Sequence, residues 1–252
     1  MKKIRTKKII IILAVIIALP MFLWYAAVPD SSIGYLLASR PVGPGLSIEA
    51  TNFHKGLFFS FGADAVSAKN GGKVALILKD VHGRINPLAL LLFRLNVPFR
   101  ASLAGGTARG FFDYSFFSGQ KKLRVRFDSV QIGELPPLKR SVSGVLNANL
   151  AFSGDKGNFL FTLDSLGNFP YGFRSANGVA RLTGTEINIG SVSLDSPDTY
   201  AKLKGQANLE NGSYNLRLEI TKQGAPDPLL TPYQQSPGYY VIPLSGDFRQ
   251  LL

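Results

Sequence analysis

The feature that most constrains this chain is a strict alternation of apolar and polar side chains, repeated in one segment after another beyond residue 45. Within Tyr214–Ile220, Tyr, Leu, Leu and Ile occupy every second position, and Asn, Arg and Glu stand between them. The same period of two runs through 123–128, 146–153 and 200–207. Because successive side chains of a strand point to opposite faces, the pattern predicts an antiparallel sheet with one apolar face and one wet face.

Turn signals separate these runs and predict where the strands end. They are Asn70–Gly72, Ser118-Gly119, Gly154–Gly157 and Asn211-Gly212, all of which contain residues that accept the positive φ of tight hairpins. One helix is predicted beyond residue 45, at Asn86–Arg94, since Asn86 suits an N-cap and Pro87 a first helical position. A buried strand is the alternative for this apolar segment. The proline-rich segment 223–238 should be irregular.

The N-terminus carries a second strong signal, which concerns a membrane. Residues 1–8 hold five cations, and residues 9–28 form an unbroken run of uncharged, mostly apolar side chains. A helix of this length rises about 30 Å, the thickness of a bilayer's hydrocarbon core. The basic flank favours the cytoplasm, and Trp24 and Tyr25 suit the opposite interface. A cytoplasmic segment (1–8), one transmembrane helix (9–28), a Pro/Gly tether (29–45) and a periplasmic β domain (46–252) are therefore expected, with the anchor in the inner membrane of a two-membrane bacterium.

A cleaved signal peptide has a similar layout and is the alternative to a permanent anchor. Cleavage needs small residues at the −3 and −1 positions. Cutting after Ala27 would place Tyr25 at −3, and cutting after Ala26 would place Trp24 there. The apolar run also exceeds the ~7–15 residues of an ordinary signal sequence. These points favour an uncleaved anchor.

Composition limits the partners and the chemistry. The chain has 28 Lys and Arg against 16 Asp and Glu, and without the five N-terminal cations 23 remain against 16. This excess favours an anionic membrane surface or an acidic partner, while the predicted topology keeps the domain away from nucleic acid. The absence of cysteine excludes disulfides, thiolate chemistry and cysteine-ligated metals.

Candidate catalytic residues are sparse. His54 and His82 are far apart in sequence, and neither has a carboxylate at metal-ligand spacing. No Gly-x-Ser-x-Gly elbow occurs, and Gly105–Gly110, which has the glycine spacing of a phosphate loop, is followed by Phe111 where lysine is required. The five glutamates are scattered. We therefore expect a non-enzyme with no catalytic, cofactor or metal site.

Two clusters stand out in the alternating sequence. An aromatic cluster suggests a strand buried on both sides, with an apolar groove or membrane-facing surface as the alternative. A basic cluster suggests a solvated strand face, with a headgroup or partner surface as the alternative. The aromatic residues are Phe111, Phe112, Tyr114, Phe116 and Phe117, preceded by Phe58, Phe59 and Phe61; the basic ones are Lys121, Lys122, Arg124, Arg126, Lys139 and Arg140.

The layout resembles that of AsmA-like periplasmic proteins. The matching features are the basic anchor, the tether, the first strand at Gly45–Ala50, the unit Leu203–Leu209 with the strand Tyr214–Ile220 behind it, and the glycine-rich Leu103–Gly110. Size, single anchor and the ending at Tyr239–Gly246 resemble the type II secretion system protein N family within that group.

The resemblance implies a mainly β fold: an N-terminal transmembrane helix followed by a curved antiparallel sheet, an open trough or half-barrel. It also implies a non-catalytic accessory role in type II protein secretion, with other secretion components as partners. The alternative function is lipid handling between the inner and outer membranes, with phospholipid acyl chains in an apolar groove. In an open trough, Phe159, Phe161, Leu216 and Leu218 would line the exposed apolar side rather than a packed core.

Overall fold

The structure is a computed structural model that describes residues 46–70, 72–136, 142–224 and 227–247, together with Trp24 and Pro29. The predicted cytoplasmic segment, membrane span and tether lie outside these residues, apart from Trp24 and Pro29. Within the described part of the chain, no helix is long and apolar enough to span a membrane.

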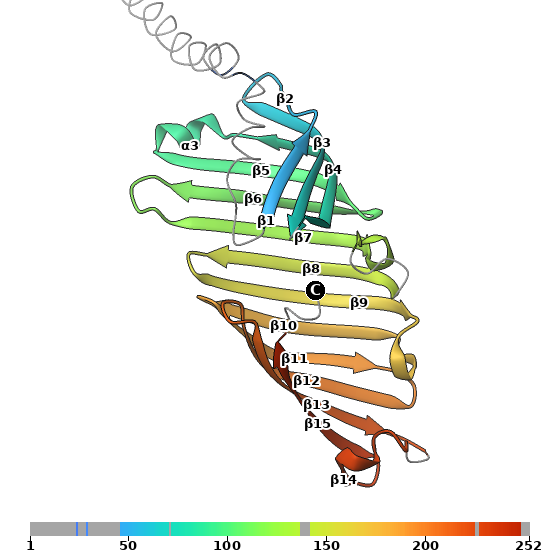
Figure 1. Cartoon of the computed structure of the whole chain (residues 1–252). Helices are drawn as coiled ribbons and strands as arrows, with labels where there is room; N and C mark the ends of the chain where they lie inside the picture. The colour runs from blue at the N-terminus through green and yellow to red at the C-terminus, as the bar shows by residue number, and fades with distance from the viewer. Residues whose placement is uncertain are drawn as a thin grey trace, which may run out of the picture. The chain divides into compact units, whose positions relative to one another are not determined.

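The prediction of a mainly β fold is confirmed. The described residues form one antiparallel, open sheet of 15 strands with the order β1-β3-β4-β5-β6-β7-β8-β9-β10-β11-β12-β13-β15-β14, and β2 pairs with β3 (Figure 1). The strands are β1 (Leu46–Thr51), β2 (His54–Lys55), β3 (Ser60–Asn70), β4 (Lys73–Arg84), β5 (Arg94–Leu103), β6 (Gly106–Ser115), β7 (Lys121–Gln131), β8 (Ser143–Ser153), β9 (Lys156–Gly167), β10 (Ser175–Thr183), β11 (Glu186–Asp195), β12 (Thr199–Asn208), β13 (Ser213–Lys222), β14 (Gln234–Ser236) and β15 (Tyr239–Asp247).

The chain divides into two compact units, Met1–Ser102 and Leu103–Leu252. The first contains strands β1 to β4 and nearly all of β5, and its buried cluster consists of Ala63, Val81 and Ala101. The second contains strands β6 to β15, and its largest buried side chains include Tyr240, Ile220 and Val130.

The predicted helix is present but shorter than expected. It is α3 (Pro87–Leu91), with Asn86 as its N-cap, and the Leu88 amide donates a hydrogen bond to Asn86 Oδ1 at 3.1 Å. Strand β5 already begins at Arg94. Among the described connections between strands, η1 (Ile132–Glu134), η3 (Pro170–Gly172) and η4 (Thr231–Tyr233) are three-residue 3₁₀ segments, and η3 is irregular because Tyr171 has φ 60°. The predicted hairpin signals lie at strand ends, and the described residues of the segment 223–238 form η4 and the three-residue β14.

Bulges keep the apolar side chains on one face where the alternation slips. In β7, Phe127 pairs with Ala148 and Val130 with Leu146, so the apolar positions are three residues apart. The extra residue is accommodated at Ser129, which has φ 56° and whose amide donates to Asn147 Oδ1 at 2.9 Å. A bulge inserts an unpaired residue and increases the local twist.

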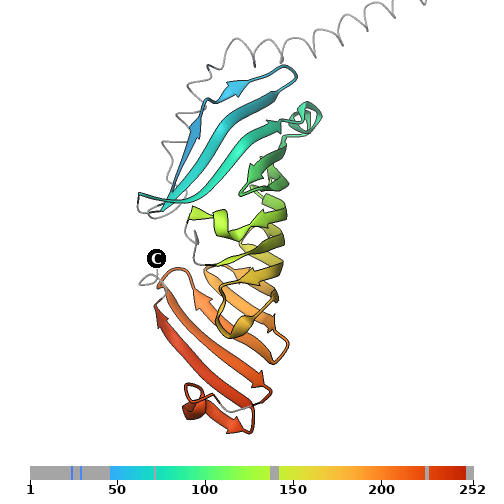
Figure 2. The same cartoon turned by 90° about the vertical axis from the view of Figure 1, so that its right-hand side faces the viewer.

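Twist along the strand order is visible within the second unit. In Figure 2 the yellow strands around β9 are seen almost along their edge, whereas the orange and red strands β12, β13 and β15 show their broad side. The side chains of this unit's apolar face are therefore presented on a twisted surface.

Candidate apolar binding surface

Strand pairing in the second unit places apolar residues side by side in rows that cross the sheet. Paired residues of antiparallel strands share a face, so the pairing register defines each row. One row runs from β6 to β15 without a polar side chain: Gly110, Val125, Leu150, Phe159, Ala180, Ile189, Gly205, Leu216 and Leu244. We call the face that carries this row the apolar face.

Two further rows on the same face are also apolar, apart from the hydroxyl of Tyr214. One consists of Ala108, Phe127, Ala148, Phe161, Gly178, Val192, Leu203, Leu218 and Ile242, and the other of Phe112, Leu123, Phe152, Gly157, Leu182, Ile187, Ala207, Tyr214 and Gly246. The alternation seen in single segments thus extends over nine neighbouring strands.

The opposite face carries mostly polar and charged side chains. A row there consists of Phe111, Arg124, Ala151, Asn158, Arg181, Asn188, Gln206, Asn215 and Ser245. Arg217 Nε lies 3.2 Å from Glu219 Oε1, and Lys204 Nζ lies 3.8 Å from the same oxygen. These pairs are partly exposed, so they contribute at most about 1 kcal/mol each. We call this the polar face.

Most of the apolar face carries no second layer formed by the described residues of this unit. The main contacts there join strands that are neighbours in the sheet, and η1 also contacts β8 while η4 contacts β15. As a result, the large side chains of β8 to β11 are only half-buried. We call this region the open stretch; it comprises Leu150, Phe159, Phe161, Leu182, Ile187 and Ile189.

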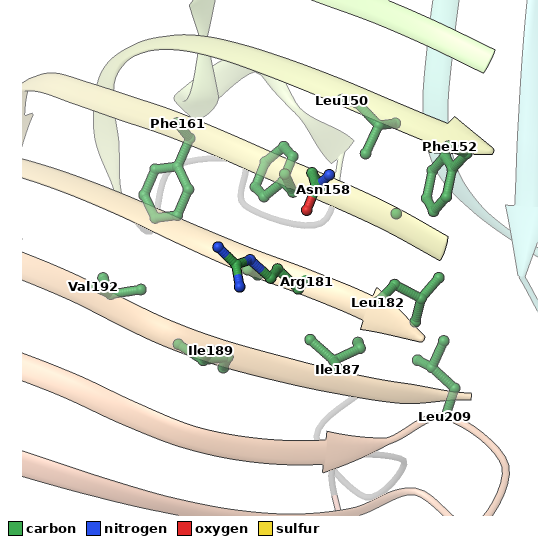
Figure 3. Close-up of a pocket in the computed structure, with 13 residues that line it drawn as sticks. Leu150, Phe152, Asn158, Phe161, Arg181, Leu182, Ile187, Ile189, Val192 and Leu209 are labelled. Atoms are coloured by element: carbon green, nitrogen blue, oxygen red, sulfur yellow. The ribbon is translucent and has the colours of Figure 1, made fainter. Parts of the chain in front are cut away.

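A hollow lies over the open stretch. It has a volume of ≈ 430 Å³, and Figure 3 shows side chains from neighbouring strands around it. Phe159 and Phe161 stack with ring centroids 5.5 Å apart. Asn158 and Arg181 also border the hollow, but they pair with each other and alternate with Phe159 and Leu182, which places them on the polar face. The apolar face therefore supplies a recess with no charged group of its own.

The apolar face is closed at one end. There Ala201, Ile220 and Tyr240 are 1–2% exposed, because Phe173 and Leu230 from two connections pack against them. Leu218 and Ile242 join the same cluster as partly buried neighbours. We call this region the covered end.

Each connection over the covered end is held by its own contacts. Phe173 lies edge-on to Phe169, with ring centroids 6.2 Å apart. Asp227 Oδ1 accepts a hydrogen bond from the Leu229 amide at 3.0 Å, and the Asp227 carbonyl accepts one from Thr231 Oγ1 at 3.1 Å. Leu230 is thereby presented to the sheet, while Leu229 points into solvent with 79% of its surface exposed.

The aromatic cluster is not a strand buried on both sides, so that interpretation is wrong. Phe112 belongs to the apolar face, whereas Phe111 lies on the polar face with the Arg124 guanidinium 5.7 Å from its ring centroid. Both side chains are half-buried. Phe116 and Phe117 lie in the turn after β6 and are 54% and 80% exposed. Phe58 is exposed and Phe59 buried, in the connection between β2 and β3.

The described part of the basic cluster is a solvated strand face, as predicted. Lys121, Lys122, Arg124 and Arg126 are all exposed on β7, and Arg126 Nε lies 2.7 Å from Asp128 Oδ1. Lys139 and Arg140 lie outside the described residues.

The two histidines are closer in space than their sequence separation suggests. His54 on β2 and His82 on β4 both pair with Gly62 of β3, so they lie on the same face of the first unit. His54 Nδ1 is 3.1 Å from the Asn52 carbonyl. Among the described residues, no group of three His, Asp or Glu side chains could hold a metal ion. Gly106–Gly110 lies within strand β6, where it cannot act as a phosphate loop ahead of a helix.

No family model, curated protein or solved structure matches this chain. The apolar face and its hollow are thus the features from which a function can be argued.

Proposed function

We propose that this chain is a non-catalytic protein of the bacterial cell envelope that holds lipid acyl chains along its apolar face. The observation that carries the proposal is the set of apolar rows across nine strands, which are half-buried over the open stretch and carry no second layer there from the described residues of the same unit. Large exposed apolar surfaces on such a domain mark a binding site for a ligand, a partner or a membrane.

The dimensions of the apolar face suit acyl chains. Eight spacings of about 4.8 Å separate β6 from β15, which gives about 38 Å across the strands. One leaflet of a bilayer contributes about half of a ~30 Å hydrocarbon core, so the face offers room for more than one acyl chain. Each Å² of apolar surface removed from water contributes about 25 cal/mol, which favours a long, flexible hydrocarbon as ligand. The proposal also includes the more specific fold expected from the sequence, an open trough like that of AsmA-like proteins.

The proposed location follows from the N-terminal sequence. Five cations before residue 9 hold the N-terminus in the cytoplasm, the span 9–28 anchors the chain in the inner membrane, and the β domain stands in the periplasm. A reporter that works only in the periplasm, fused after Leu252, should be active, and full-length protein should fractionate with the inner membrane. Recovery of a soluble, N-terminally trimmed chain would contradict the anchor.

Photo-crosslinking in cells tests the lipid ligand. A crosslinking residue at Phe159, Leu182 or Ile187 should form lipid adducts. The matched controls are Asn158, Arg181 and Asn188, each adjacent to one of the test positions but on the polar face. The lack of adducts at the three apolar positions, or equal adducts on both faces, would overturn the proposal.

A second candidate is an accessory role in type II protein secretion, and the open edge of β15 favours it. Strand β14 pairs only through Gln234 with Tyr240 and Ser236 with Tyr239, so no described strand pairs with the outer edge of Val241–Gly246. An exposed edge can accept a strand from a partner protein. Crosslinkers at Val241 and Ser245 should then capture a secretion component. Neighbouring genes for a secretion ATPase, a secretin and pseudopilins would support this role, and their absence would speak against it.

A further inference from the structure

Six large apolar side chains gather at one end of the first unit and are exposed. They come from two connections, the one after β2 and the one that contains α3 (Figure 1). Each is between 57% and 70% exposed: Leu57, Phe58, Leu88, Leu91, Leu92 and Phe93. We call this set the apolar tip.

The two connections are joined at their bases. The Ile85 amide, at the start of the second connection, donates a hydrogen bond to the Phe59 carbonyl in the first at 2.9 Å. The Asn86 amide then donates to the Asn96 carbonyl, also at 2.9 Å, which closes the base of the second connection. Helix α3 has no buried residue, so its leucines do not contribute to the core of the unit. Packing within the described residues therefore does not explain why leucine occupies these exposed positions.

The charged residues that flank the two connections in sequence are cations. Lys55 precedes the first connection, and Arg84 and Arg94 stand on either side of the second. Residues 50–63 and 81–102 contain no Asp or Glu. Apolar side chains bordered by Lys and Arg are the composition of a surface that rests in the interface of a membrane with anionic lipids.

Trp24 connects the apolar tip to the predicted membrane span. Its ring centroid lies 5.9 Å from that of Phe59 in the first connection, and its carbonyl accepts a hydrogen bond from Lys55 Nζ at 3.1 Å. Trp24 belongs to the apolar run 9–28 and stands near its end, where the chain would leave the bilayer. These contacts place the connection after β2 next to the end of the predicted membrane span.

We infer that the apolar tip inserts into the periplasmic interface of the inner membrane, among anionic phospholipids. The inference rests on the anchor of the proposed function but not on lipid binding by the apolar face. Burial of the six side chains in the headgroup region removes apolar surface from water, and the cations near them attract the anionic headgroups. The first unit is then fixed against the membrane rather than free at the end of its tether.

Fluorescence of the full-length chain in vesicles tests this contact. The chain contains no cysteine, so Phe58→Cys and Leu92→Cys each give one site for an environment-sensitive dye. In vesicles of phosphatidylethanolamine and phosphatidylglycerol, both labels should be blue-shifted and quenched by lipids that carry a spin label near the headgroup. Leu229→Cys is the matched control, an exposed leucine in a connection of the second unit, and its label should show neither effect.

A second variant separates insertion from simple proximity. Leu91→Glu with Leu92→Glu, in the chain labelled at position 58, should reduce the quenching and the blue shift, because two carboxylates oppose entry into an anionic interface. Quenching absent at positions 58 and 92, or unchanged by the two glutamates, would overturn the inference. Lipid adducts at Phe159 test the apolar face separately, so either proposal can fail alone.

Discussion

The covered end and the open stretch belong to the same apolar face, yet their side chains differ sharply in burial. Ile220 and Tyr240 are 2% and 1% exposed, whereas Phe159 and Leu182, from the same sheet, are only half-buried. The strands do not differ in pattern; two connections that carry Phe173 and Leu230 cross one region and leave the other uncovered. An apolar sheet face therefore becomes either a packed core or a ligand surface, depending on whether other segments cover it.

The largest effect should come from a charge placed on the apolar face. Ile220→Asp at the covered end buries a carboxylate without a partner and should lower the free energy of unfolding by more than about 4 kcal/mol, or prevent folding. Leu182→Asp in the open stretch should lower it by less than about 1 kcal/mol, because water reaches the carboxylate. Urea unfolding of both variants measures the difference. Equal losses would mean that the open stretch is also a core.

Removing one covering side chain should have the next largest effect. Leu230→Ala leaves a cavity above Tyr240 and should lower the free energy of unfolding by about 2–4 kcal/mol. The adjacent Leu229 is 79% exposed, and Leu229→Ala should change stability by less than about 0.5 kcal/mol. A thermal or urea transition gives both values. If the two variants behave alike, the covered end is not held by Leu230.

Strand β12 contains a glycine that the sheet requires. Gly205 has φ +144°, and a Cβ there would collide with the Asn215 carbonyl of β13. Gly205→Ala should therefore lower the free energy of unfolding by about 1–3 kcal/mol. Gly154 has φ +64° in a turn with open space around it, so Gly154→Ala should cost only about 1 kcal/mol. A larger loss at Gly154 than at Gly205 would contradict this account.

The smallest effect is expected on the polar face. Arg217→Asp removes a partly exposed ion pair with Glu219, and the free energy of unfolding should change by no more than about 1 kcal/mol. Its neighbour Leu218 packs against the covered end, so Leu218→Asp should abolish folding or function. Raising the salt concentration should reduce the Arg217→Asp effect, since exposed pairs are screened. A loss at Arg217 comparable to that at Leu218 would show that the two faces are not distinct.

The sequence predicted the two faces and most of the turns, because both depend on local chemistry. Alternation in Tyr214–Ile220 assigns Leu216 and Leu218 to one face without knowledge of neighbouring strands, and Asn211-Gly212 marks a hairpin. The rows themselves needed the pairing register, which the sequence did not specify. Asn86 and Pro87 likewise predicted where α3 begins, but not that it ends at Leu91.

The covered end could not be predicted, because it depends on irregular segments. Leu229-Leu230 was a signal, an apolar pair within a proline-rich segment, but nothing local distinguishes the buried leucine from the exposed one. The bulge at Ser129 was also visible, as an interval of three between Phe127 and Val130 in an otherwise strict alternation. Phe111 and Phe112 are consecutive, so they lie on opposite faces of their strand. Aromatic side chains on both faces were interpreted as burial on both faces, and that interpretation was wrong.

Short hairpins join several strands of the second unit, for instance Gly154-Asp155 between β8 and β9 and Gly184-Thr185 between β10 and β11. Each strand contacts little beyond its immediate neighbours, so one more hairpin, on the order of 20–25 residues, would add about 10 Å to the sheet without disturbing existing rows. Gene duplication of a single hairpin is therefore enough to change the protein's reach. In a sheet of this kind, the width of the sheet across its strands increases in proportion to the number of hairpins that the gene encodes.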